Sequence, residues 1–282
     1  MRFAVVGHVE WVDFLGVDHV PVAGEIVNVR DWWDEAAGGG AVAVVQLAKL
    51  AGGATFYTAL GDDDLGRRSE AQLRSQGVEV EAAVRERPQR RAVTFLDVRG
   101  ERTIATIGSR LVATADDDLR WDRLAEMAGV YFTGADTGAL RAARAARVLV
   151  ATPRARAALE GSGVEVDALV RSGRDPGEQG QPEQLGYSAR VIVTTEGSRG
   201  GIYSGPDGRT GSFESAPLPG PVADAYGAGD SFAAGLTYGL GVGMELDAAL
   251  AIACRCGAGN LTGRGPYSGQ PTAADLGLKR GD

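Results

Sequence analysis

The sequence has few of the residues that build metal and disulfide sites. Only two cysteines, Cys254 and Cys256, and two histidines, His8 and His19, occur among its 282 residues. The cysteines are one residue apart in an expected helix and therefore point to different sides, so we expect reduced thiols rather than a disulfide. So small a set of cysteine and histidine side chains does not favour a zinc site.

Other absences exclude whole classes of function. No apolar run approaches the ~20 residues of a membrane span, and the first residues do not have the pattern of a signal peptide. The net charge of −8 provides no basic surface for nucleic acid. We therefore expect a cytoplasmic protein with neither a membrane nor a nucleic acid as partner. Residues 7–10 follow the first expected strand without the Gly-x-Gly-x-x-Gly pattern of a nicotinamide-dependent oxidoreductase.

The order of apolar segments predicts an α/β fold. Short apolar runs alternate with helical periodicity, including expected helices at 139–147 and 154–160, which favours a mainly parallel sheet between helices. Two segments, at about 12–35 and 91–107, have only the alternating pattern of strands. We expect one domain over residues 1–282, with these insertions forming a small β lid. Residues 173–184 are expected to form a polar loop.

The stretch from Asp224 to Phe232 carries the main chemical signal. Gly227, Ala228 and Gly229 lie where a proline-containing loop enters an apolar helix. The first N–H groups of a helix have no partner inside it and attract anions, phosphate above all. Asp230 is at the same point, where a carboxylate can take a proton while the amides stabilise a transferring phosphoryl group.

Two other interpretations of this stretch are simpler or different. Asp230 could be a helix-capping residue in a glycine turn without chemistry. Gly229-Asp230-Ser231 also matches a type of serine hydrolase, but that enzyme needs a histidine base, normally downstream of the serine. Both histidines precede Ser231, so we discount the hydrolase.

Five segments together resemble the ribokinase-like (PfkB) carbohydrate kinases. They are 38–41, 61–66, 100–103, 195–200 and 224–235. The last of these departs from the family at Ala225, where Thr or a similar small residue is usual. The resemblance implies a three-layer α/β/α sandwich and a reaction that uses ATP and Mg²⁺. It also implies Asp230 as the catalytic base and Gly227, Ala228 and Gly229 as the anion hole.

The resemblance also assigns residues to the acceptor. It implies contacts from Gly38, Gly39 and Gly40, and from Asp230 itself. The family has an Asp about five residues after the glycine that ends the first strand. Asp13 is our candidate for this hydroxyl-binding residue, but it is six residues after Gly7, so Glu10 remains an alternative. A second departure is Ala43, where the family has an Asn, and it suggests a less hydroxylated or differently shaped acceptor.

On the nucleotide side the resemblance implies three groups of residues. The nucleotide is expected beside Thr195, Gly197, Gly200, Gly229 and Cys254. Ser172 and Asp175 fall where the family has the Asn and Glu that organise Mg²⁺, and their oxygens also suit that ion. Asp224 is the candidate for a monovalent cation such as K⁺, which some members of the family bind.

The sequence therefore predicts an ATP-dependent kinase that phosphorylates a hydroxyl of a sugar, a sugar derivative or a nucleoside. The alternative is a weakly active or inactive kinase fold that binds such a molecule as a sensor or scaffold. Ala43, Ser172 and Asp175 motivate this alternative, and the intact motif at 227–230 opposes it. The lid strands are also a candidate homodimer interface, because exposed strand edges invite pairing.

Overall fold

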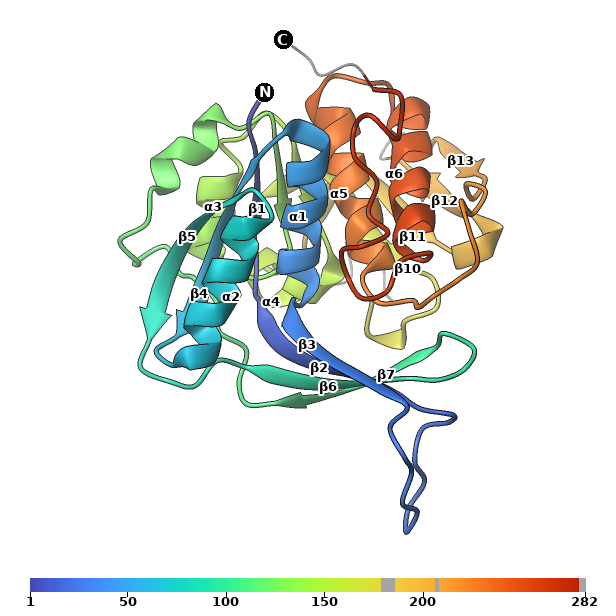
Figure 1. Cartoon of the computed structure of the whole chain (residues 1–282). Helices are drawn as coiled ribbons and strands as arrows, with labels where there is room; N and C mark the ends of the chain where they lie inside the picture. Colours follow the sequence, from blue (N-terminus) through green and yellow to red (C-terminus); the bar gives the residue numbers. More distant parts are fainter. Residues whose placement is uncertain (179–185, 206–207, 279–282) are drawn as a thin grey trace.

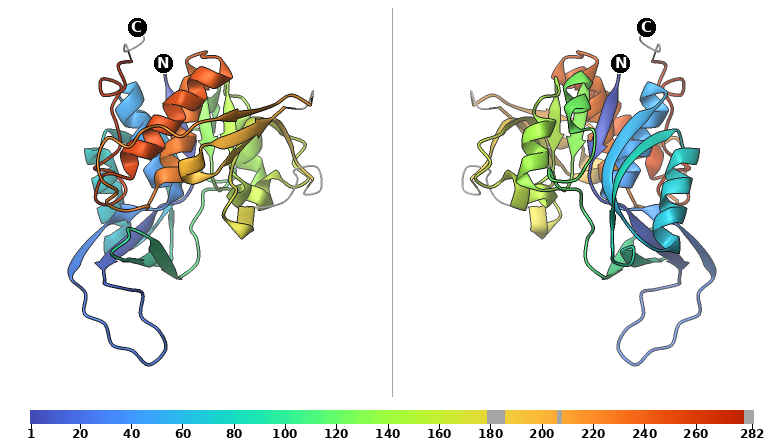
Figure 2. Two further views of the ribbon diagram at one scale, coloured as in Figure 1. Left: turned by 90° about the vertical axis from the view of Figure 1, so that its right-hand side faces the viewer. Right: turned by 90° about the vertical axis from the view of Figure 1, so that its left-hand side faces the viewer.

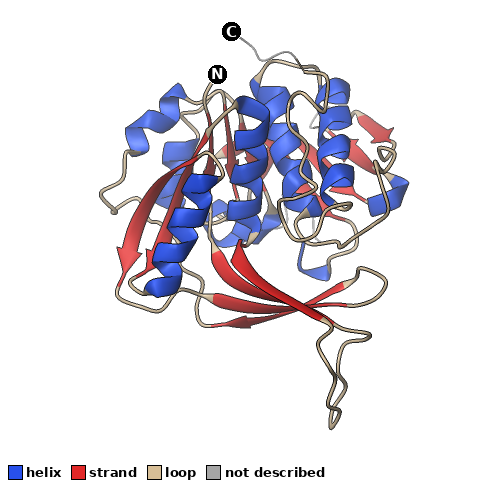
Figure 3. Ribbon diagram, viewed as in Figure 1, coloured by secondary structure: helices blue, strands red, loops and turns tan. Residues whose placement is uncertain are grey.

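Two β-sheets form the framework of the protein. The computed structural model describes residues 1–178, 186–205 and 208–278. A large sheet has helices on both faces, and a small sheet extends beyond one of its edges (Figures 1 and 3). Among the described residues, no helix has the length and apolar character needed to cross a membrane.

The bounds of the elements follow the alternation expected from the sequence. The strands are β1 (Phe3–Val6), β2 (Glu10–Gly16), β3 (Asp31–Ala37), β4 (Ala54–Gly61), β5 (Val78–Arg85), β6 (Arg91–Leu96), β7 (Arg102–Ile107), β8 (Gly129–Phe132), β9 (Leu149–Ala151), β10 (Glu165–Ser172), β11 (Ser188–Thr195), β12 (Gly201–Ser204) and β13 (Thr210–Phe213). The α-helices are α1 (Gly39–Ala51), α2 (Asp64–Ser75), α3 (Thr137–Ala143), α4 (Arg156–Leu159), α5 (Ala228–Gly241) and α6 (Leu246–Asn260). The 3₁₀-helices are η1 (Trp121–Glu126), η2 (Pro153–Ala155), η3 (Pro176–Glu178) and η5 (Gly197–Arg199).

The large sheet is buried on both faces. Its strand order is β13-β12-β11-β10-β9-β8-β1-β4-β5, parallel except for the pairings of β12 with β11 and β13. In β1, Phe3 and Val5 join an apolar cluster with α1, α5 and α6, while Ala4 and Val6 join a second cluster with η1, α3 and α4. Figure 2 shows these helices on opposite sides of the sheet. This arrangement confirms the expected three-layer sandwich.

The small sheet comes from the two expected insertions. Its order is β3-β2-β6-β7, with β2 and β6 parallel and the other pairs antiparallel. The first insertion begins earlier than expected, at Glu10, and residues 17–30 between β2 and β3 contain neither strand nor helix. Phe14 of β2 stacks on Trp33 and meets the edge of Tyr226, so this face of the small sheet packs against the loop that precedes α5.

Two expected helices are shorter than their sequence patterns suggest. The helix at 139–147 is α3, which ends at Ala143, because Ala145 and Ala146 instead donate to carbonyls three residues earlier. The helix at 154–160 divides into η2, which begins at Pro153, and the single turn α4. In the expected loop at 173–184, residues 176–178 form η3 and residues 179–184 lie outside the described part of the chain.

Candidate active site

The central strands β1 and β8 end side by side and release two loops at the same edge. These strands are parallel, with Val6 opposite Phe132, so Gly7 and Thr133 leave the sheet together. A Cβ atom on Gly7 would collide with the Thr133 methyl group. The carboxyl edge of a parallel sheet is where α/β proteins bind their ligands.

Helices α1 and α5 bring Gly39 and Asp230 together at this edge. A Cβ atom on Gly39 would lie 2.8 Å from Asp230 Oδ1 and 3.5 Å from Thr133 Oγ1. A Cβ atom on Gly40 would lie 2.8 Å from the His8 carbonyl oxygen. Gly39 and Gly40 are therefore required by close packing, and they let the amino end of α1 approach the carboxylate.

The amino end of α5 has the features of an anion-binding site. Gly227 precedes the helix with φ near 80°, and a Cβ atom there would lie 2.7 Å from Val42 Cγ1. The first helical bond runs from Ser231 N to Gly227 O, so the amides of residues 228–230 have no partner inside the helix. No side chain caps this end, and Gly229 is exposed. The positive end of the α5 dipole is thus open to a ligand.

Burial adjusts the acidity of Asp230. Loss of solvent raises the pKa of its carboxyl to about 6, and the negative charge of Glu178 acts in the same direction. Arg102 and Arg154 lower this pKa and oppose the shift. Asp230 is mainly ionised at neutral pH, yet its pKa is close enough to neutrality for a general base.

The small sheet contacts the loop that leads into α5. Arg102 of β7 donates from Nη1 to the Ala225 carbonyl at 2.7 Å, and the Ala225 amide donates to Gly100 O at 3.1 Å. The β6–β7 hairpin is therefore attached to the motif that carries Asp230. Such a sheet over the site can exclude water from the reaction.

Comparison with known proteins identifies the family. The sequence matches the family described as "pfkB family carbohydrate kinase" over residues 2–169 and 178–273. The chain belongs to this family. It is 29% identical over 288 residues to the "ATP-dependent ribose-1-phosphate kinase" of Halopiger xanaduensis, covering 97% of this chain and 96% of that protein.

Solved ribokinases share the fold of the whole chain. The Arabidopsis thaliana enzyme, in a complex with ribose and ATP, superposes with a TM-score of 0.78 at 19% identity, covering 98% of this chain and 97% of that one. The Giardia lamblia enzyme has a TM-score of 0.79 at 16% identity, covering 98% of both chains. The fold is therefore ribokinase-like, as the sequence predicted, and the pfkB family makes the protein a phosphotransferase enzyme.

The alternation of strand β2 separates the two candidates for the hydroxyl-binding residue. Glu10 lies at Gly38, where a Cβ atom would be 3.4 Å from Glu10 Cγ. Asp13 has the opposite parity along the strand, and its Oδ2 accepts a bond from Arg91 Nη2 at 2.8 Å. The structure thus brings Glu10, and not Asp13, to the loop beside Asp230.

Ala43 lies in the apolar interior. It is fully buried in α1 and belongs to the main apolar cluster. The family pattern has an Asn at this position. Its side-chain amide would lie where this chain has only a methyl group. No hydroxyl of an acceptor would find a polar partner in the Ala43 side chain.

The predicted metal-binding pair is occupied by internal bonds. Ser172 Oγ accepts from the amides of Arg174 and Asp175, and the Asp175 carboxylate pairs with Arg154. Sequence reasoning missed Glu178, which pairs with Arg154 at 2.8 Å and accepts from Ser172 N at 2.7 Å. Glu178 also acts electrostatically on Asp230. The spacing of Asp175 and Glu178 repeats that of Ser172 and Asp175, which is the signal that could have identified it.

The predicted nucleotide-binding residues border strands β11 and β13. Thr195 ends β11, and its carbonyl accepts from the Gly173 amide at 2.9 Å, which joins the ends of β10 and β11. Gly197 and Gly200 both have positive φ, near 64° and 78°. Cys254 of α6 donates to Glu214 O at 3.3 Å, and burial raises the pKa of its thiol to about 11. Cys254 is thus a neutral thiol beside the segment that follows β13.

Asp224 is buried at the start of the 224–232 stretch. Its two carboxylate oxygens accept from the amides of Tyr226, at 2.8 Å, and Gly265, at 2.7 Å. Burial raises the pKa of this carboxyl. The bonds hold the 263–266 loop against the start of the motif, which is the place predicted for a monovalent cation.

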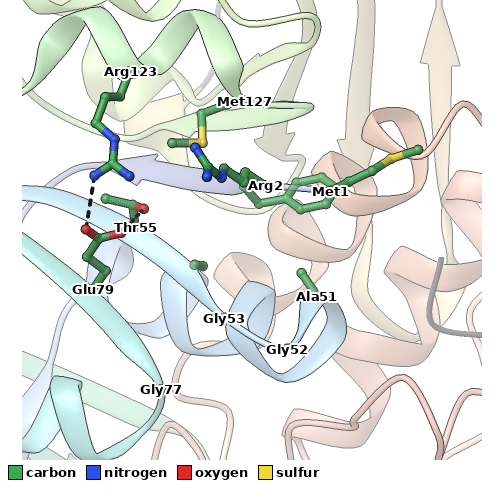
Figure 4. Close-up of a pocket in the computed structure, with 12 residues that line it drawn as sticks. Met1, Arg2, Ala51, Gly52, Gly53, Thr55, Gly77, Glu79, Arg123 and Met127 are labelled. Carbon is green, nitrogen blue, oxygen red and sulfur yellow. Dashed lines mark hydrogen bonds and ion pairs between the residues drawn. The ribbon is translucent and has the colours of Figure 1, made fainter. Parts of the chain in front are cut away.

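A surface pocket lies at the opposite edge of the sheet. Figure 4 shows it between Arg2, the Gly52–Gly53 turn, Glu79 and Arg123. Arg2 and Gly53 immediately precede strands β1 and β4, whereas Asp230 lies at their carboxyl ends. This pocket is therefore remote from the candidate active site, and it is lined by none of the predicted site residues.

Proposed function

We propose that the protein transfers the γ-phosphoryl group of ATP to a hydroxyl of a sugar, a sugar derivative or a nucleoside. The observation that carries this proposal is the position of the Asp230 carboxylate between Gly39 and the uncapped amino end of α5. The Halopiger relative is named for ATP and ribose 1-phosphate, and the Arabidopsis structure holds ATP and ribose. These names support ATP as donor and a sugar as acceptor.

The reaction follows from this geometry. The acceptor hydroxyl lies beside the 38–40 loop and in reach of Asp230, which takes its proton. The hydroxyl oxygen bonds to the γ-phosphorus as the bond to the β–γ bridging oxygen breaks, and ADP leaves. The amides of Ala228, Gly229 and Asp230 stabilise the charge on the transferring group, and loss of one such donor typically costs ~10²–10³ in rate.

The residues near Asp230 fit a magnesium-nucleotide complex in part. Among the described residues, no cluster of three His, Cys, Asp or Glu side chains could hold a metal alone. Magnesium in kinases is usually bound by one or two carboxylates together with phosphates and water, and it neutralises charge on the phosphates. Glu178 is our candidate for the carboxylate that orients this complex, with Asp175 and Ser172 shaping its loop.

The test is ADP release from Mg·ATP with pentoses, hexoses, their phosphates and nucleosides. Wild type is compared with Asp230→Asn, for which we expect a loss of about 10²–10⁴ in kcat because the general base is removed. Asp64→Asn is a matched control, because Asp64 is also in the first turn of a helix but is exposed on α2. Turnover that survives in Asp230→Asn would contradict the proposal. Stabilisation by an acceptor without ADP release would favour a binding protein.

A further inference from the structure

Arg110 presents an unpaired guanidinium to the active site. It follows β7 on the connection that leads back to the large sheet, and it is exposed. Its Nη1 lies 3.9 Å from the position of a Cβ atom on Gly134, directly after Thr133. It makes no hydrogen bond or ion pair with any described residue, so its donors are free to bind a ligand.

Arg90 is a second cation with unused donors, and it is mostly buried. Only 12% of its side chain is exposed, and its Nη1 lies 3.2 Å from Glu10 Oε1. Its Nε is buried without a hydrogen-bond partner within the described ranges. A buried donor without a partner is unfavourable by about 1–3 kcal/mol, so this arginine is incompletely satisfied by the protein itself.

Close contacts connect both arginines to the catalytic carboxylate. Arg90 contacts Glu10, and Glu10 contacts Gly38, which precedes the Gly39 beside Asp230. Arg110 lies at Gly134, next to the Thr133 hydroxyl that also faces Gly39. The two guanidinium groups therefore border the space where the acceptor would lie.

Like charges surround Arg110. Burial and the like charges of Arg90 and Arg154 lower the pKa of Arg110, and Glu10 is the one negative group that counteracts them. Burial also lowers the pKa of His8, which leaves its ring neutral at pH 7. Glu10 thus faces two arginines that have no other carboxylate partner among the described residues. A bound anion would give both guanidinium groups a second charged partner besides Glu10.

We propose that the acceptor carries a phosphate monoester, which Arg90 and Arg110 bind while the hydroxyl to be phosphorylated faces Asp230. Planar guanidinium groups bind phosphate oxygens through paired hydrogen bonds, so two of them match a doubly charged phosphate. An uncharged sugar would leave the Arg110 guanidinium without an ion pair and the Arg90 guanidinium with Glu10 alone among the described residues. This inference rests on the proposed kinase function and narrows its substrate to sugar phosphates, so the product is a bisphosphate.

The test compares Arg110→Met and Arg90→Met with Arg91→Met. Arg91 is the next residue in the chain, but it pairs with Asp13 on the other face of the small sheet, which makes it a matched control. With ribose 1-phosphate and ribose 5-phosphate as acceptors, we expect KM for the better one to rise about 10- to 100-fold in each site variant, as for a lost charged hydrogen bond. The KM for ATP should not change. Arg110 is exposed, so its variant remains informative if Arg90→Met fails to fold.

Three results would overturn the inference. The first is a wild-type kcat/KM for ribose equal to that for its phosphates. This result would rule out the phosphate subsite but would still support the kinase function. The second is a rise in KM for ATP with an unchanged KM for the acceptor, which would assign the arginines to the nucleotide. The third comes from a binding measurement that needs no turnover, the rise in Tm of Asp230→Asn with each ligand. Equal rises with ribose and with ribose 1-phosphate would show that no phosphate subsite exists, whether or not the enzyme is active.

Discussion

The arginines on the two sides of Asp230 differ in the number of carboxylates with which they pair. On the side of β10 and η3, Arg154 pairs with both Asp175 and Glu178. On the side of the small sheet, Arg110 has no partner within the described ranges, and Arg90 has only Glu10. A paired cation fixes a loop, whereas an unpaired cation at a site is available to a ligand. We therefore propose that the side of β10 and η3, which ion pairs already organise, binds the nucleotide and that the side of the small sheet binds an anionic acceptor.

The largest effect is expected where the two sides meet. In Gly39→Ala, the new methyl group would lie 2.8 Å from Asp230 Oδ1, so the carboxylate must move. Because a 1 Å misplacement can reduce catalysis about 10²-fold, we expect a loss of this size in kcat for every acceptor. Gly220→Ala is the control, since its Cβ would lie an ordinary 3.8 Å from Thr262 Cβ. Unchanged kcat in Gly39→Ala would argue against the acceptor position.

A second glycine tests the nucleotide side alone. A Cβ atom on Gly229 would meet no protein atom within 4 Å, so Gly229→Ala should fold normally, and helix propensity favours Ala by up to ~1 kcal/mol. The methyl group would instead narrow the anion site at the end of α5. We expect KM for ATP to rise, whereas Tm should not fall and KM for the acceptor should not rise. A normal KM for ATP would place the nucleotide phosphates elsewhere.

The third comparison separates Glu178 from Asp175. Both carboxylates pair with Arg154, but among the two only Glu178 raises the pKa of Asp230. In Glu178→Gln, we expect the Mg²⁺ concentration at half-maximal rate to rise about 10-fold, as for loss of an outer-shell group. Asp175→Asn also weakens the ion pair and should change this concentration much less. Equal effects would mean that the loop, and not Glu178, organises the metal.

Features formed by one continuous stretch of the sequence were the ones that could be predicted. The motif from Gly227 to Asp230 is a single stretch, and its loop-to-helix junction and anion-site geometry were predictable from local rules. The strand and helix alternation likewise predicted both sheets. The family match, which covers most of the chain, confirms the family, and the solved ribokinases confirm the fold, whereas the role of the motif as an anion site stays a prediction.

Features that depend on register or on distant segments were harder to predict. Asp13 and Glu10 differ in strand parity, and the sequence does not say that β2 begins at Glu10 rather than near residue 12. Glu178 lies in η3, beyond the end of β10 from which the metal residues were aligned. Arg90 and Arg110 flank the open end of the β6–β7 hairpin, where Arg91 pairs with Ile107, but neither belongs to a motif that indicates a role in the site.

The smallest effect is a shift in pH dependence, which tests the charge that the small sheet places on Asp230. Arg102 lowers the pKa of Asp230, so Arg102→Met should raise this pKa above its value of about 6. Because the base must be ionised, the acid limb of the kcat/KM profile should move to higher pH, with little change on the alkaline plateau. Arg99→Met is the control in the same hairpin, since Arg99 is exposed and pairs with Asp97. An acid limb that stays in place, or moves to lower pH, would mean that Asp230 is not the group that titrates.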